Sequence, residues 1–142
     1  MAGKEKARLE ALYKFGILHT PPEKELDEIT QLASLICETP VSLISLFEQE
    51  QQWFKSKVGT DLDSTPIDSS FCRHAIDSGE EVFIVNSPLD HINFRENPLV
   101  TGDPHIRFYA GVPLRTEEGH GIGALCVIIR RKERLVNDKL RV

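Results

Sequence analysis

The stretch RFYAGVPLRTEEGHGIGALCVII, residues 107–129, decides the fold. Its two ends are apolar and rich in β-forming residues, while its middle is polar and contains glycine. This pattern predicts two strands, 107–114 and 122–129, joined by a hairpin loop at 116–121. The second strand is apolar on both faces, which is typical of a strand that is covered from both sides. It therefore belongs at the centre of a sheet.

A strand of the same kind lies upstream. Residues 41–47, VSLISLF, are also apolar on both faces, so we expect them to lie beside the last strand. Residues 53–58 place Lys55 and Lys57 on one face, which indicates a strand nearer the edge of the sheet. A further short strand is expected at 82–85. The sequence thus predicts five strands, with the first and last side by side.

The main helix is predicted at 21–38. Thr20 can cap its first turn, Pro21 suits its first position, and Glu23 can complete a capping box by reaching back to the cap. Pro40 ends the helix. Four apolar side chains recur at helical spacing and are expected to face the core: Leu26, Ile29, Ala33 and Ile36.

Two other helices are predicted. Residues 4–15 form an N-terminal helix that Gly16 ends, and its apolar stripe consists of Leu9, Leu12 and Tyr13. This helix has little core of its own to cover, so we expect it to pack partly on its own domain and partly in a parallel homodimer. Residues 70–77 form a short helix, closed by Gly79.

Residues 87–106 interrupt the regular pattern, because they contain Pro88, Pro98 and Pro104 among several turn-forming residues. An ordered connection of this length usually covers a site or binds something. The strands do not alternate regularly with long helices, so a doubly wound parallel sheet does not fit. We predict an α+β fold with an antiparallel sheet of five to six strands. The N-terminal helices cover one face, and the loop 87–106 caps a ligand on the other.

The composition of the chain limits the classes of function that it can have. The chain has 142 residues, 40% of them hydrophobic and 27% charged, which fits one globular domain over 1–142. Three cysteines without paired spacing, and no apolar run long enough for a membrane span, indicate a cytoplasmic protein. The net charge of −5 argues against a nucleic-acid partner. Residues 130–142 hold six basic and two acidic side chains, a net of +4, which leaves −9 for the rest.

Several runs in the right order resemble a bacterial subgroup of GAF domains, which usually stand at the N-terminus of sensor histidine kinases and diguanylate cyclases. The resemblance covers about 8–129, with 130–142 as a basic tail that begins a C-terminal linker helix. His19 departs from the subgroup, which usually has an acidic residue there, and the chain stops soon after Leu135. The runs that carry the resemblance are Arg8-Leu9 to Gly16-Ile17-Leu18, Thr20-Pro21-Pro22-Glu23, Gln52-Trp53-Phe54-Lys55, Ser70-Phe71-Cys72 with His74-Ala75-Ile76, Asn97-Pro98-Leu99-Val100, Ile106-Arg107-Phe108-Tyr109-Ala110-Gly111 through Pro113-Leu114, and Ile122-Gly123-Ala124-Leu125-Cys126-Val127.

This resemblance implies a GAF-like, profilin- or PAS-like sheet with strand order 2-1-5-4-3, counting the five predicted strands along the chain. It also implies a non-catalytic sensory module of a signalling system such as a two-component system. Such a module binds a small molecule, forms a homodimer and regulates an attached C-terminal output domain. A unit that only dimerises, without a ligand, is a further alternative. The residues carry no metal, flavin or bilin signature, so any ligand is unidentified.

Cysteine chemistry offers the main enzymatic alternative, a small redox enzyme of the free methionine sulfoxide reductase type using Cys72. Cys72 and His74 are two apart on a predicted helix and should point to different sides, so they do not form a nucleophile pair. Cys37 is expected on the packed face of the main helix and Cys126 on a buried strand, where free cysteine behaves as an apolar side chain. Cys72 is thus expected to lack a resolving partner.

Other ligands have weaker support. A metal site would draw on Asp90, His91, Asp103 and His105, but their spacing matches no metal motif. Bilin attachment is not carried over, because Arg73 separates Cys72 from His74. The signature of cyclic-nucleotide-binding GAF domains is not recognisable, and no phosphate-binding glycine loop is present.

A ligand pocket is predicted between the strand 107–112 and the loop 87–106. Alternation places Phe108, Ala110 and Val112 toward the helices, and Arg107, Tyr109 and Gly111 toward the loop. Alternatively, Arg107 only ties the loop down by bonding Asp90 or Asp103. No catalytic residue is assigned. The residues expected to wall the pocket are Phe71, Cys72, Phe94, His105, Arg107 and Tyr109.

Overall fold

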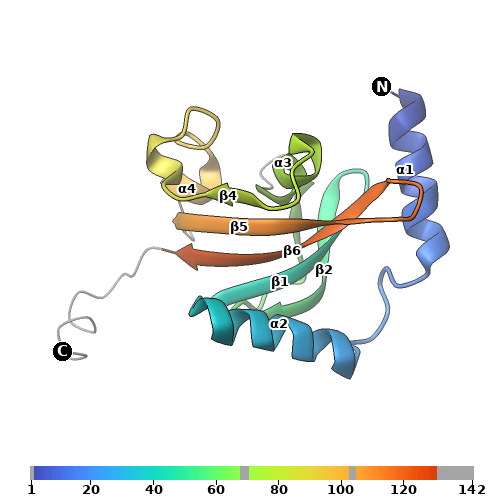
Figure 1. Ribbon diagram of the computed structural model, residues 1–142, viewed down its shortest axis with the longest axis horizontal. Coiled ribbons are helices and arrows are strands. Elements are labelled where there is room, and N and C mark those ends of the chain that lie inside the picture. The colour runs from blue at the N-terminus through green and yellow to red at the C-terminus, as the bar shows by residue number, and fades with distance from the viewer. Residues whose placement is uncertain (1, 68–70, 103–104, 131–142) are drawn as a thin grey trace.

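The computed structural model describes residues 2–67, 71–102 and 105–130. Six strands form one antiparallel sheet in the order β3-β2-β1-β6-β5-β4 (Figure 1). The order predicted for five strands is therefore confirmed. The sixth, β3, is a three-residue edge strand that the sequence pattern did not reveal. The strands are β1 (Val41–Phe47), β2 (Gln51–Val58), β3 (Ser64–Pro66), β4 (Phe83–Val85), β5 (Ile106–Arg115) and β6 (Gly121–Arg130).

The two strands that are apolar on both faces, β1 and β6, pair at the centre, as predicted. Ile44 lies opposite Leu125, and Leu43 lies opposite Cys126. All seven residues of β1 are buried, because helical layers cover both sides of it. Gly123 makes the close pairing possible, since a Cβ there would lie 2.0 Å from the carbonyl oxygen of Ser45.

Helices lie on both sides of this sheet (Figure 1). The long helix α2 (Lys24–Cys37) covers β1 and β2 on one side. The opposite side carries α3 (Phe71–Ser78), the 3-10 helix η2 (Pro88–Asp90) and α4 (Pro98–Thr101). Residues 87–102 and 105–106 thus lie on the side of the sheet where the loop was predicted.

The N-terminal helix α1 (Ala2–Phe15) stands across the end of the sheet, next to the β5–β6 hairpin (Figure 1). Leu12 is fully buried and packs with Leu46 and Ile122. Tyr13 and Phe15 are more than half exposed. The helix therefore uses one apolar residue as its main anchor and leaves two aromatic rings at the surface.

The predicted start of α2 is wrong, and only half of its predicted apolar stripe turns inward, since Leu26 and Ala33 are partly buried. The helix begins at Lys24, and its N-cap residue Glu23 makes no side-chain capping bond. Ile29 and Ile36, assigned to the core, are 45% and 70% exposed, whereas Thr30 is fully buried. The cause is the sheet below. Ser56 of β2 bonds the Thr30 hydroxyl at 2.6 Å, so a polar face of the helix turns inward.

Lys55 lies on β2, one strand from the edge of the sheet, which agrees with the predicted strand nearer the edge. It lies at an irregularity of the β1–β2 ladder, between the pairs Ile44–Ser56 and Ser45–Phe54. Its side chain is fully buried. The ammonium group donates to Thr20 Oγ1 at 2.6 Å and Pro21 O at 2.7 Å, and pairs with Glu23 at 2.8 Å. The residues predicted as a capping box therefore enclose this cation instead of starting the helix.

Candidate functional site

Aromatic side chains fill the space between β5 and the segment that folds over it. Phe71, at the start of α3, stacks on Phe94 with ring centroids 4.3 Å apart and lies 5.3 Å from the ring of Tyr109. Phe94 and Tyr109 are fully buried, and Phe71 is 3% exposed. Tyr109 faces this layer from β5, as strand alternation predicted. Four of the six predicted site residues, these three and Cys72, are therefore packed against one another.

Tyr109 occupies its place because its neighbour two residues on has no side chain. A Cβ at position 111 would lie 2.3 Å from the Tyr109 hydroxyl oxygen. Gly111 thus leaves room for the phenol, whose hydroxyl donates a hydrogen bond to Cys72 Sγ at 3.0 Å. Burial raises the pKa of Tyr109 well above its usual value, so this hydroxyl remains protonated.

The two buried cysteines are neighbours. Cys72 Sγ lies 3.6 Å from Cys126 Sγ and 3.8 Å from the hydroxyl oxygen of Ser45. The expectation that Cys72 lacks a resolving partner is therefore wrong. Periodicity could not reveal this pair, because it joins a helix to a strand 54 residues away. Cys37, expected to be packed, is exposed, because α2 is rotated relative to its apolar stripe.

Both buried thiols lie in surroundings that disfavour charge. The hydrogen bond with Cys72, followed by burial, raises the pKa of Cys126 well above its usual value. Cys72 and Cys126 are 3% and 1% exposed. A thiol needs its thiolate form to act as a nucleophile, and buried cysteines in apolar surroundings are inert. The arrangement favours a structural role for the pair.

His74 points away from the thiols, as its spacing from Cys72 predicted. It lies on the outer side of α3, where its ring is 4.8 Å from that of Phe94. Partial burial lowers the pKa of His74, which favours the neutral imidazole. The ring of His91 also lies beside Phe94, with the two ring centroids 4.9 Å apart.

Arg107 and His105 lie at the border of this aromatic layer. The Arg107 guanidinium donates to the carbonyl oxygen of Val100 in α4 at 2.9 Å. Arg107 therefore contacts the loop, as the alternative prediction stated, but its partner is a backbone carbonyl and not an aspartate. Asp90 accepts instead from the Ser87 hydroxyl, and Asp103 lies outside the described residues. His105 takes a left-handed backbone conformation, with φ of 63°. Whether the six residues wall a pocket stays a prediction.

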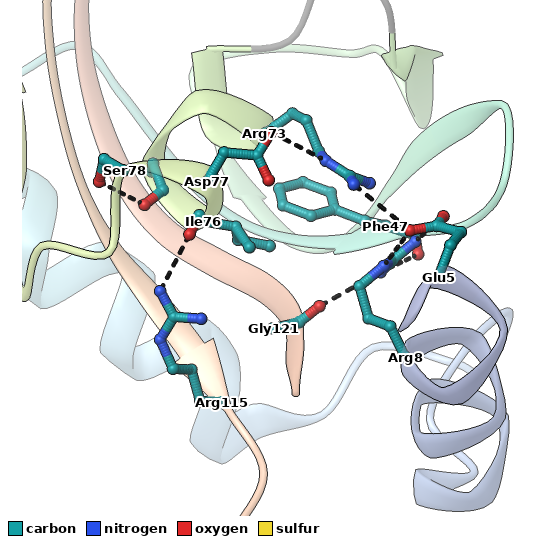
Figure 2. A network of polar contacts seen from close by, with 10 residues as sticks. Glu5, Arg8, Phe47, Arg73, Ile76, Asp77, Ser78, Arg115 and Gly121 are labelled. Atoms are coloured by element: carbon teal, nitrogen blue, oxygen red, sulfur yellow. Dashed lines mark hydrogen bonds and ion pairs between the residues drawn. The ribbon is translucent and has the colours of Figure 1, made fainter. Parts of the chain in front are cut away.

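A polar network connects α1 to α3 and the sheet (Figure 2). Arg8 is 6% exposed, and its guanidinium donates to the carbonyl oxygens of Phe47 at 2.9 Å and Gly121 at 3.2 Å. The rest of the guanidinium pairs with Glu5 at 2.8 Å, and Arg73 of α3 reaches the same carboxylate at 3.3 Å. These contacts, chiefly the hydrogen bond from Arg8, lower the pKa of Glu5 to about 2.

Sequence reasoning missed this network. The spacing of Glu5 and Arg8 on one helix was a usable signal for the first pair. The contact with Arg73 was not foreseeable, since it joins residues 68 positions apart. Arg73 also pairs with Asp77 along α3 at 3.4 Å. The network thus links the helix that carries Cys72 to the N-terminal helix.

Within 2–67, 71–102 and 105–130, no group of three or more His, Cys, Asp or Glu side chains could hold a metal ion. In the same ranges, no helix has the length and apolar character that crossing a membrane requires.

The GAF domain family model matches residues 21–139. A cyclic di-GMP phosphodiesterase of Pseudomonas aeruginosa is 41% identical over 126 residues, which are 89% of this chain and 21% of that protein. The chain thus spans about a fifth of this curated relative.

Two solved structures show the same fold. A type II free methionine-R-sulfoxide reductase from Thermoplasma acidophilum superimposes with a TM-score of 0.59 at 13% identity, over 92% of this chain and 86% of the other. The GAF domain region of a putative membrane protein from Geobacter sulfurreducens gives 0.52 at 16% identity, over 97% and 90%. With the family match over most of its length, the chain belongs to the GAF domain family.

Proposed function

We propose that this GAF domain is a non-catalytic sensory module that binds a small ligand and regulates an attached output domain in a bacterial signalling protein. The observation that carries the proposal is the 41% identical relative, of which the chain spans 21%. A domain that makes up about a fifth of a protein works together with the other domains of that protein. A histidine kinase or diguanylate cyclase is the output that the sequence resemblance implies, and the relative's name adds a cyclic di-GMP phosphodiesterase. Three free cysteines support a cytoplasmic location.

The ligand site belongs to the region between β5 and the segment 87–106. Phe71, Phe94 and Tyr109 offer stacking surfaces, and Arg107 supplies a positive charge at their border. Guanidinium groups recognise carboxylates and phosphates in a planar, two-pronged geometry, so an anionic ligand is expected. Such a ligand would compete with the Val100 carbonyl for Arg107 and would displace aromatic side chains that now contact one another.

Mass spectrometry of molecules that copurify with the native full chain identifies the ligand class. Binding of that molecule is then compared in the Arg107→Ala and Arg107→Lys variants. The proposal expects weaker binding in both, with little change in melting temperature. If Arg107→Ala instead lowers stability strongly and leaves binding unchanged, Arg107 is a structural clamp, and the domain's ligand, if any, binds elsewhere.

The neighbouring thiols of Cys72 and Cys126 support one alternative function, that of a free methionine sulfoxide reductase using Cys72. Reduction of a sulfoxide to a thioether and water would consume the two thiol hydrogens and leave a Cys72–Cys126 disulfide, which the 3.6 Å separation permits after a small shift. The raised pKa of Cys126 and the burial of both thiols oppose it. Turnover of free methionine sulfoxide that Cys72→Ser abolishes would replace the sensory proposal with this one.

A further inference from the structure

Residues 89–97, which connect Pro88 to helix α4, have a single buried side chain. We call these residues the turn segment; it lies over β5 (Figure 1). Of its residues, all of which the structure describes, Phe94 alone is buried. Leu89 and Ile92, the other large apolar side chains of the segment, are 48% and 77% exposed. The place of the turn segment on the domain therefore depends strongly on what the Phe94 ring contacts.

The Phe94 ring lies among four other rings. Phe71 of α3 stacks on it, with centroids 4.3 Å apart and planes inclined by 17°. His74 and His91 meet it at an angle, with centroids 4.8 Å and 4.9 Å away, and Phe83 of β4 lies 6.2 Å away. Phe71 is buried, whereas His74 is exposed and His91 half-buried. These four rings, which we call the ring cage, thus enclose one flat six-membered ring beneath a rim of two imidazoles.

A second contact holds the chain just beyond the turn segment. The Arg107 guanidinium donates to the carbonyl oxygen of Val100 in α4 at 2.9 Å. This carbonyl is a neutral acceptor, and a carboxylate is a stronger partner for a guanidinium. The two contacts differ in chemistry, because one is a flat ring in the cage and the other is an oxygen acceptor on Arg107. A molecule that carries both groups replaces both contacts at once.

We propose that Phe94 closes the ligand site of this domain by occupying the ring cage, and that the ligand is an aryl carboxylate. Its ring displaces Phe94, and its carboxylate takes Arg107 from the Val100 carbonyl. Displacement of Phe94 also releases the turn segment, so binding changes the surface that the domain presents. This inference rests on the proposed function and adds the class of ligand and the group that keeps the site closed.

The walls of the cage favour an uncharged ring with polar substituents. Burial lowers the pKa of His74, which favours its neutral imidazole, and two of the other walls are phenyl rings. His91 Nδ1 accepts a hydrogen bond from the backbone N–H of Asn93 at 3.1 Å, so a neutral His91 carries its proton on Nε2. A phenyl ring cannot bond an imidazole nitrogen, whereas a hydroxyl group on the ring of a ligand can. Phe94 therefore fills the shape of the cage without using its polar rim.

The proposal makes an unusual prediction about affinity. A ligand that must displace Phe94 binds with an apparent affinity reduced by the fraction of molecules in which the cage is open. Removing the Phe94 ring removes this penalty. Truncation of Phe94 should therefore tighten binding, whereas truncation of a residue that contacts the ligand weakens it.

Calorimetric titration of the full chain tests this prediction. The probes are benzoate, phenylacetate and phenylpropionate, which differ in the distance between ring and carboxylate. Phe94→Ala should tighten binding of the best probe by about tenfold or more, because a minor open state holds about a tenth of the molecules or fewer. Ile92→Ala truncates an exposed side chain of the same segment and should leave the affinity unchanged.

Matched ligands separate the two halves of the site. The alcohol with the carbon skeleton of the best probe should bind about tenfold more weakly, because it lacks the charge that Arg107 recognises. The cyclohexyl carboxylate of the same length should bind roughly three- to tenfold more weakly, because it lacks the flat ring. Arg107→Ala should reduce the affinity for the aryl carboxylate to that for the alcohol, and it should leave the affinity for the alcohol unchanged.

Fluorine NMR shows whether Phe94 moves in the protein with its natural side chain at that position. The chain is labelled with 4-fluorophenylalanine, and the signal that Phe94→Leu removes is assigned to Phe94. The best probe should shift this signal toward that of the exposed Phe15 and make it sensitive to a soluble paramagnetic reagent. The signal of Phe47, which is buried in β1, should stay protected. This measurement does not require that a truncated variant folds.

The proposal is overturned if the wild type binds none of the aryl carboxylates, or binds one while the Phe94 signal stays protected. It is also overturned if Phe94→Ala folds and binds the best probe more weakly than the wild type does. A non-aromatic anion that copurifies with the protein and requires Arg107 would overturn this ligand class and leave the proposed function standing. The two failures are therefore distinguishable.

Discussion

At the scale of single residues, two buried groups decide local geometry. Lys55 is a fully buried cation with three oxygen partners, and Tyr109 is a buried phenol that leans over a glycine. A buried charge is tolerated only when it is paired and hydrogen-bonded. A close side-chain approach is tolerated only where the backbone has no Cβ. Each condition gives a prediction.

For Lys55, we expect that removing the charge of its partner Glu23 costs more stability than replacing Lys55 itself. Glu23→Gln should lower the free energy of unfolding by about 1–2 kcal/mol, because it leaves the buried ammonium without its carboxylate. Lys55→Met should cost less, since an apolar side chain of similar shape removes the charge that needs compensation. Urea unfolding measures both. A larger loss for Lys55→Met would show that the three polar contacts outweigh the desolvation of the cation.

For Tyr109, the prediction concerns coupling. Gly111→Ala should destabilise the fold by about 1–3 kcal/mol, because the new methyl group overlaps the phenol. In a Tyr109→Phe background, the same change should cost less, since the hydroxyl oxygen is the nearest atom. A double-mutant cycle from denaturant unfolding gives the coupling energy. Additive effects would mean that the strand shifts away from the ring in both backgrounds.

At the scale of elements, α1 and α3 are held together by a carboxylate between two guanidinium groups (Figure 2). The α3 helix carries Phe71 and Cys72 on its inner side and Arg73 on its outer side. A ligand that displaces α3 would therefore also disturb the Glu5 contact. Under the proposed function, this network conveys occupancy of the site to α1.

The pH dependence of stability tests the network. The pKa of Glu5 is about 2 in the folded protein against a usual value of 4.5, so the folded state binds fewer protons between these values. The contribution of Glu5 is therefore fully present above pH 4.5 and is lost as the pH falls toward 2. Glu5→Gln should flatten this acid limb in urea titrations, whereas Glu10→Gln on the same helix should preserve it. Parallel profiles for wild type and Glu5→Gln would contradict the assignment.

At the scale of the whole molecule, the surface of α1 bears on assembly. Tyr13 and Phe15 are 55% and 57% exposed, while Leu12 anchors the helix to its own domain. We expect these two rings to contact a second copy in a parallel homodimer. Closed twofold dimers are the commonest homo-oligomers.

Light scattering on the full chain and on a Tyr13→Asp, Phe15→Asp variant tests this assembly. The wild type should be a dimer and the variant a folded monomer, because charges replace the exposed rings while Leu12 and Arg8 keep the helix in place. Leu12→Asp is the contrasting change and should unfold the helix end. A monomeric wild type, or a variant that remains a dimer, would remove α1 from the interface.

The sequence by itself determined the α+β class, the order of five strands and the family. Strands apolar on both faces belong at the centre of a sheet, and this rule alone paired β1 with β6. The alternation of side chains along a strand is likewise a local property, and it predicted that Tyr109 faces the segment 87–106.

Only the tertiary structure decided which side of α2 is buried, where Lys55 finds its partners and which residues meet Cys72 and Glu5. Helical periodicity locates an apolar stripe, but the hydrogen bond between Thr30 and Ser56 of the sheet holds Thr30 on the buried side of the helix. Cys72 meets Cys126 and Glu5 meets Arg73 across 54 and 68 residues of chain. Such contacts depend on how the elements are packed, and no local pattern records the packing.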